Sequence, residues 1–145
     1  MTQQEAAAKL HTYIYHKGHT PVKVTKHLVR FWWKVINHAV FGGTLIPARH
    51  IELMFSDVVY AWAIPSTNSR IDLHIQDTFH ERTTFLTVLI HEMVHAWEFM
   101  TYGRMGHGKR FTQWTNAIEE RTPLFLRKII RDHEHTRKRP RRRGS

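Results

Sequence analysis

Two histidines and a glutamate with a fixed spacing are the residues of this sequence best suited to chemistry. His91, Glu92 and His95 make up a His-Glu-x-x-His segment inside an apolar run. Side chains four positions apart lie on the same face of an α-helix, so both imidazoles can reach one metal ion. This spacing favours zinc, and it places the carboxylate of Glu92 to act as a general base toward a water molecule. The segment therefore predicts a zinc site with hydrolytic chemistry.

The two histidines do not complete such a site, because catalytic zinc usually takes three protein ligands and leaves one position for water. The leading candidate for the third ligand is His107, since three glycines within four residues of it allow the chain to turn back after the helix. The rival is Glu98, which lies seven residues after His91 and near the same helix face. It is the weaker candidate, because three ligands on one straight helix are spread over about 10 Å of its axis.

These segments resemble the SprT-like metallopeptidases, a family that includes bacterial SprT and the eukaryotic Spartan proteases. The match extends over about residues 25–118, and three segments carry it: residues 91–96 (His-Glu-Met-Val-His-Ala), residues 106–111 (Gly-His-Gly-Lys-Arg-Phe) with Trp114 soon after, and residues 41–45 (Phe-Gly-Gly-Thr-Leu). Several members carry a cysteine zinc ribbon after the peptidase domain, and this sequence has no cysteine.

The resemblance implies a zincin-like domain in which zinc is held by His91, His95 and His107, with Glu92 as the catalytic base. It also implies protein substrates, with proteins attached to DNA as the leading class. The donor that would stabilise the oxyanion is not assigned by the sequence, and its candidates are Tyr60, Tyr102, Arg104 and Lys109.

The site helix is predicted from Thr83 or Thr84, either of which can cap its start, to Gly103, which can end it. Apolar residues recur at three- and four-residue spacing along it and predict an amphipathic helix. These residues are Phe85, Leu86, Leu89, Ile90, Met93, Val94 and Trp97.

Two helices are predicted before the site helix and two after it. The first lies within residues 1–18, and the second runs over residues 25–41 until Gly42 and Gly43 stop it. The apolar stripe of the second helix consists of Leu28, Phe31, Trp32, Val35, Ile36 and Ala39. After the site, one helix is predicted through residues 111–118 and another from Pro123 onward.

Three short segments between these helices predict strands, at about residues 50–55, 58–64 and 70–75. The third alternates most clearly, with Ile71, Leu73 and Ile75 on one face. Short turn-rich connections between the segments favour an antiparallel three-stranded sheet. The fold class is therefore α+β, with a single domain over residues 1–136.

The end of the chain is strongly basic and predicts a disordered arm over residues 137–145. Of the formal net charge of +10, the six cations of this arm account for all but +4. Such a cluster favours contact with a polyanion, so DNA is the expected partner, single- or double-stranded. The candidate DNA-binding residues are Arg137, Lys138, Arg139, Arg141, Arg142 and Arg143.

The remaining composition limits the protein classes that the sequence favours. The absence of cysteine excludes a disulfide framework, and no apolar run has the length of a membrane span. The N-terminal segment lacks the pattern of a signal peptide, so we expect a cytoplasmic protein, associated with the nucleoid or the nucleus if it binds DNA. Two alternatives stay open: a nucleic-acid-binding protein with a non-catalytic zinc site, and a zinc hydrolase that acts on a non-peptide bond.

Overall fold

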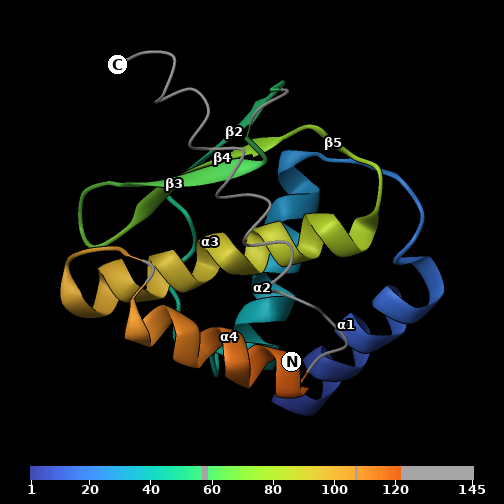
Figure 1. Ribbon diagram of the computed structural model, residues 1–145, viewed down its shortest axis with the longest axis horizontal. Helices are drawn as coiled ribbons and strands as arrows, with labels where there is room; N and C mark the ends of the chain where they lie inside the picture. The colour runs from blue at the N-terminus through green and yellow to red at the C-terminus, as the bar shows by residue number, and fades with distance from the viewer. Residues whose placement is uncertain (57–58, 107, 122–145) are drawn as a thin grey trace.

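The computed structural model describes residues 1–56, 59–106 and 108–121, and this part of the chain forms four helices and two small sheets. A three-stranded sheet covers one side of the site helix, and the last helix lies on its other side (Figure 1). This arrangement confirms the α+β class. The helices are α1 (Gln3–Lys17), α2 (Lys26–Val40), α3 (Arg82–Tyr102) and α4 (Lys109–Arg121), and the strands are β1 (Val22–Lys23), β2 (His50–Met54), β3 (Ala61–Pro65), β4 (Ile71–Gln76) and β5 (Thr78–Phe79).

The first two helices form where the sequence predicts them, and side-chain caps explain their starts. The hydroxyl of Thr25 accepts a hydrogen bond from the backbone N–H of Leu28 at 3.1 Å, which satisfies one of the open donors of α2. Beyond the end of α2, Gly42 and Gly43 both have positive φ angles, as the predicted stop requires. The buried amide of Asn37 then binds both the N–H and the carbonyl of Leu45 at 3.0 Å, which fixes the chain as it leaves the helix.

The larger sheet has the strand order β2-β4-β3 and corrects the predicted topology. β3 pairs with β4 in the antiparallel sense, but β2 runs parallel to β4, with Ile51 opposite Leu73. The prediction of an all-antiparallel sheet is therefore wrong for one of its two pairs. The short connections led to this error, because the chain passes through β3 before it returns to pair β4 with β2.

A second sheet, absent from the prediction, pairs β1 with β5 in the antiparallel sense. These strands have two residues each, too few to show a period in the sequence. The start of α3 is fixed in the same region, where the guanidinium of Arg82 donates to the hydroxyls of Thr20 and Tyr13. Neither Thr83 nor Thr84 caps α3; Glu81 occupies the N-cap position without a capping hydrogen bond from its side chain.

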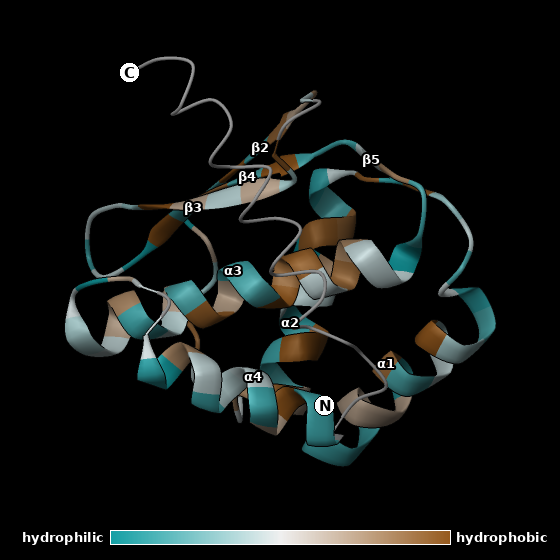
Figure 2. Ribbon diagram, in the orientation of Figure 1, coloured by the Kyte–Doolittle hydropathy of each residue, from teal (hydrophilic) through white to brown (hydrophobic). Residues whose placement is uncertain are grey.

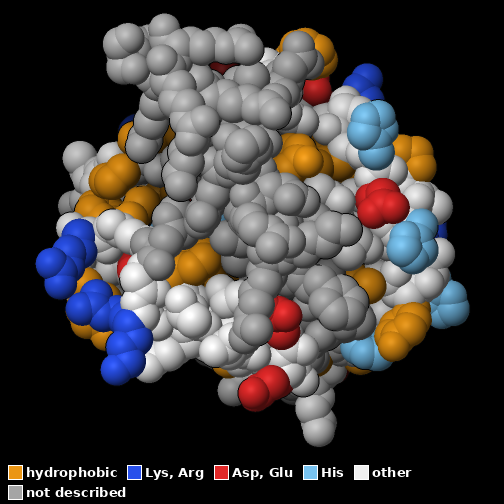
Figure 3. Space-filling model, viewed as in Figure 1, with side chains coloured by type: hydrophobic (Ala, Val, Ile, Leu, Met, Phe, Trp, Pro, Cys, Tyr) orange, Lys and Arg blue, Asp and Glu red, His pale blue; other side chains and the backbone are white. Residues whose placement is uncertain are grey.

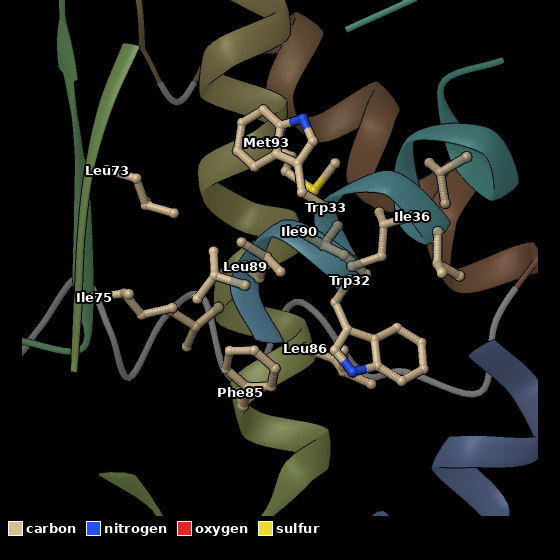
Figure 4. Packing of buried hydrophobic residues seen from close by; sticks show 14 of the residues in the cluster. Trp32, Trp33, Ile36, Leu73, Ile75, Phe85, Leu86, Leu89, Ile90 and Met93 are labelled. Atoms are coloured by element: carbon tan, nitrogen blue, oxygen red, sulfur yellow. The ribbon is translucent and has the colours of Figure 1, made fainter. Parts of the chain in front are cut away.

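The hydrophobic core lies between the sheet, α3 and α2. Side chains of β4, among them Leu73 and Ile75, point toward α3, whose opposite side meets α2 (Figure 4). The colouring by hydropathy shows the corresponding brown segments where α2 and α3 cross (Figure 2). The predicted buried face of β4 is confirmed, since Ile71, Leu73 and Ile75 are at most 2% exposed.

The predicted stripe of α2 is wrong at one position. Phe31 is 42% exposed, whereas Trp33, outside that stripe, is buried. The ring of Phe31 contacts Trp32 edge-on with 5.2 Å between centroids and lines an open groove between α1 and α2. The buried face of α2 is thus rotated by about one residue toward α3 and the sheet.

Within the described residues, no helix is both long enough and apolar enough to cross a membrane. The predicted helix from Pro123 and the basic arm over residues 137–145 lie outside the described part of the chain.

Candidate metal centre

The middle of α3 carries the His-Glu-x-x-His segment in the deepest part of the protein. The sequence predicted an amphipathic helix here. Every residue from 85 to 96 is buried, however, so the middle of the helix is covered on all sides. The helix ends as predicted at Gly103, which adopts the left-handed conformation with φ 75° and donates its N–H to Phe99. The site residues are therefore held by a helix with little freedom to shift.

The two histidines turn the same ring nitrogen toward each other. The Nε2 atoms of His91 and His95 are 3.2 Å apart, and both side chains are buried. Together with Glu92 they form a group whose ligand atoms all lie within 4.8 Å of one another. Two nitrogens bound to one tetrahedral zinc ion at about 2.0–2.1 Å lie about 3.3 Å apart, so the observed separation fits zinc. The donor set of two imidazoles and a carboxylate is also one that zinc accepts.

Phe111 of α4 covers both imidazole rings. Its ring stacks on His95 with 5.0 Å between centroids and meets His91 edge-on at 4.9 Å. The start of α4 is in turn tied to the rest of the fold by Trp114, which contacts Phe41 at 4.7 Å and Trp97 at 5.1 Å. The predicted helix behind the site is thereby confirmed, and it supplies an apolar wall that restricts the motion of both rings.

Glu98 lies beside the site, although not where a direct ligand is expected. Its Oε1 atom is 3.4 Å from Nδ1 of His95, the ring nitrogen on the side away from His91. The backbone N–H of Gly106 donates a hydrogen bond to the same carboxyl group. Burial raises the pKa of Glu98, against the lowering effects of the Gly106 hydrogen bond and the nearby Arg110. The sequence signal for this contact is the spacing of three residues between His95 and Glu98, which brings the side chains together on a helix.

The predicted third ligand, His107, lies outside the described residues. The segments on either side of it are described and line a pocket of about 280 Å³, whose wall includes Glu98. Three cationic side chains surround this pocket, and Figure 3 shows lysine and arginine side chains gathered over the end of α3 and the start of α4. They are Arg104, Lys109 and Arg110. The basic surface predicted at the far end of the chain thus has a second, described counterpart beside the candidate metal centre.

The other candidate donors take up different positions. Tyr60 precedes β3, and its ring contacts Phe79 at 5.9 Å. Tyr102 is 48% exposed and stacks under the guanidinium of Arg110 at 3.5 Å from the ring centroid. The N-terminal histidines His11, His16 and His19 are exposed on the surface.

The sheet presents β3 as the strand next to α3. Within the described residues, β3 pairs only with β4, so its other edge is free, as is one edge of β2. The sequence did not reveal which edge is free, because strand order is not encoded in the alternation of side chains. An extended segment of polypeptide can pair with such an edge through its backbone.

Comparison with known protein families gives a match to the SprT-like family over residues 29–135. This range includes most of α2, the larger sheet, the candidate metal centre and α4. A search of the curated proteins gives no match.

Proposed function

Because the chain belongs to the SprT-like family, we propose that it is a zinc-dependent metalloendopeptidase that cleaves proteins associated with or crosslinked to DNA. The observation that carries the proposal is the pair of Nε2 atoms 3.2 Å apart with a buried glutamate beside them. A structural zinc site needs the histidines but not Glu92, since the carboxylate serves only a reaction. The combination of all three in one group therefore supports hydrolysis over a purely structural role.

The proposed mechanism assigns one task to each part of the centre. His91 and His95, with His107 as the predicted third ligand, hold zinc. When bound, zinc supplies a Lewis acid that polarises the scissile carbonyl and lowers the pKa of water. Glu92 accepts a proton from the attacking water through its carboxylate and passes it to the nitrogen of the departing amine. Phe111 keeps both imidazoles in place and excludes bulk water from one side of the centre.

The proposed position of the substrate is the free edge of β3. A peptide in extended conformation can pair there through backbone hydrogen bonds, which bind many sequences alike because they do not read side chains. Pro65, at the end of the strand, has no N–H to donate, so pairing is limited to the preceding residues. Such a mode of binding suits an enzyme that acts on diverse proteins.

The proposed association with DNA is supported by charge. Arg104, Lys109 and Arg110 line the pocket beside the centre, and six further cations lie in residues 137–143 of the sequence. Cations at both places can neutralise phosphates without reading bases, so binding would depend steeply on salt and little on DNA sequence. Deletion of residues 137–145 should weaken binding to a DNA duplex and flatten its salt dependence; unchanged binding would exclude a role for the arm.

The deciding experiment measures zinc content and casein cleavage of the purified protein, with and without single-stranded and duplex DNA. The expected result is one zinc per chain and cleavage that disappears in Glu92→Gln while zinc is kept, because the substitution removes the base but not the metal ligands. The expected loss of cleavage is about 100- to 10,000-fold. His107→Ala should lose zinc, as its predicted role as a ligand requires.

Two outcomes would contradict the proposal. Full cleavage by Glu92→Gln would show that the mechanism is wrong. Stoichiometric zinc without cleavage of any protein substrate would favour a zinc-containing DNA-binding protein, or a hydrolase of another bond if nucleic-acid substrates are cleaved instead.

A further inference from the structure

Glu98 is a buried carboxyl group to which the proposed mechanism gives no task. The side chains of His95 and Glu98 are 6% and 7% exposed, so their contact is shielded from water. A buried carboxyl group is costly to maintain unless it has partners. Its two described partners are Nδ1 of His95 and the backbone N–H of Gly106, which belong to two different parts of the metal centre.

The contact with His95 concerns the nitrogen that a metal would not use. Since Nε2 of His95 faces Nε2 of His91, Nδ1 is turned toward Glu98. An imidazole that carries its proton on Nδ1 leaves the lone pair of Nε2 for a metal ion. A carboxylate next to Nδ1 favours this tautomer, fixes the plane of the ring, and increases the basicity of Nε2.

The contact with Gly106 ties the same carboxyl group to the segment after α3. Gly106 directly precedes His107 in the sequence, and Glu98 lies in the wall of the pocket that this segment lines. One side chain thus touches a metal-site histidine of the helix and the backbone next to the predicted third ligand.

We propose that Glu98 is a positioning residue of the metal centre: it holds His95 in the tautomer and orientation that bind zinc, and it fixes the glycine segment against α3. It does not bind the metal itself. The inference rests on the proposed zinc site, but not on the reaction that the site performs. At 3.4 Å the contact is longer than the roughly 2.7–2.9 Å of a charge-assisted hydrogen bond.

The experiment compares the zinc dissociation constants of the wild type, Glu98→Gln, Glu98→Ala and Glu52→Gln by competition with a chelator. Glu52 is the matched control, because its carboxylate also contacts a histidine, His50, but on the protein surface. We expect Glu98→Ala to bind zinc about 10- to 100-fold more weakly and Glu98→Gln to show a smaller loss of at least about threefold, with Glu52→Gln unchanged. The ordering follows because glutamine keeps the size and an acceptor oxygen but loses the charge.

A cobalt-substituted sample separates positioning from direct ligation. If Glu98 only positions His95, both Glu98 variants bind one Co²⁺ with the absorption spectrum of the wild type. A changed coordination spectrum would make Glu98 a ligand and overturn the proposal. Zinc affinity of Glu98→Ala within about twofold of the wild type would also overturn it.

Two controls keep the result clear. Circular dichroism of the metal-free variants reports whether they fold. If Glu98→Ala does not fold, a zinc affinity of Glu98→Gln equal to that of the wild type is enough to refute the proposal. Because zinc affinity is measured without a substrate, a wild type that binds zinc and cleaves nothing would defeat the proposed peptidase function alone. A cleaving wild type with unaltered affinity in the Glu98 variants would defeat this inference alone.

Discussion

Two of the described pairs of histidine and glutamate, His50–Glu52 and His95–Glu98, differ in almost everything except their chemical groups. On β2, Nε2 of His50 lies 3.0 Å from Glu52, and both side chains are about half exposed. On α3, Nδ1 of His95 lies 3.4 Å from Glu98, and both are almost fully buried. The surface pair has the shorter distance, yet the buried pair is the one next to a second imidazole and a second carboxylate.

The difference shows that burial, rather than proximity, distinguishes a candidate site from an ordinary surface contact. Water screens the charges of the exposed pair, so such a pair contributes little to stability. In the buried pair each polar group is costly without a partner, and a fold that retains four such groups in one place must satisfy them together. The proposed zinc ion would provide the shared partner for two of them.

The largest expected effect separates the two pairs by metal content. His91→Ala removes one of the two converging Nε2 atoms and should abolish stoichiometric zinc, whereas His50→Ala should leave it unchanged. Elemental analysis of the two purified variants is the measurement. Loss of zinc from His50→Ala, or its retention in His91→Ala, would place the metal elsewhere.

The next effect concerns the core that surrounds the buried pair. Leu89 is completely buried on α3, so Leu89→Ala should lower the free energy of unfolding by about 2–5 kcal/mol through lost contacts and a cavity. Ile64, 39% exposed on β3, should tolerate the same change with a loss below about 1 kcal/mol. Urea unfolding of the metal-free proteins gives both values. Equal losses would show that the packing around α3 is no tighter than that at the sheet edge.

A smaller effect is expected where the buried helix ends. Gly103 has φ 75°, so Gly103→Ala should destabilise the fold by about 1 kcal/mol, although a methyl group there meets no other atom. Gly106→Ala is the matched control, since it has the same open space without a positive φ. In thermal unfolding, Gly103→Ala should melt at a lower temperature than Gly106→Ala. The reverse ranking would contradict a role for the left-handed cap.

The smallest effect belongs to the surface pair and depends on pH. The hydrogen bond with His50 holds the pKa of Glu52 below its ordinary value. A carboxyl group whose pKa is lowered by folding contributes stability above its unfolded pKa and loses it as the pH falls through the folded one. Glu52→Gln should therefore cause a slight drop in melting temperature at pH 7 that disappears as the pH falls through the lowered pKa of Glu52. A large drop at pH 7 would mean that the exposed pair contributes more to stability than its exposure to water predicts.

The parts of the fold that the sequence could predict are those with a local signal. The spacing of His91 and His95, the glycine that ends α3, and the alternation along β4 all follow from the geometry of one element. The structure confirms the predicted α+β class, and the family match confirms the resemblance to the SprT-like family. The roles of His107 and of the basic arm stay predictions.

The parts that could not be predicted depend on contacts between distant elements. Nothing in β2 or β4 encodes their parallel pairing, because side-chain alternation is the same in both directions. The burial of Trp33 in place of Phe31 reflects where α3 crosses α2, and the two-residue strands β1 and β5 exist only as each other's partners. The contact between Glu98 and Nδ1 of His95 requires the ring orientation that the partner imidazole and Phe111 determine.

Because β2 pairs directly with β4, the edge strand β3 is not needed to join these two strands. β2 ends at Met54 and β4 begins at Ile71, and the segment between these residues provides β3. Under the proposed function, changes in this segment would act on substrate binding, whereas the histidines and Glu92 of α3 would be unchanged.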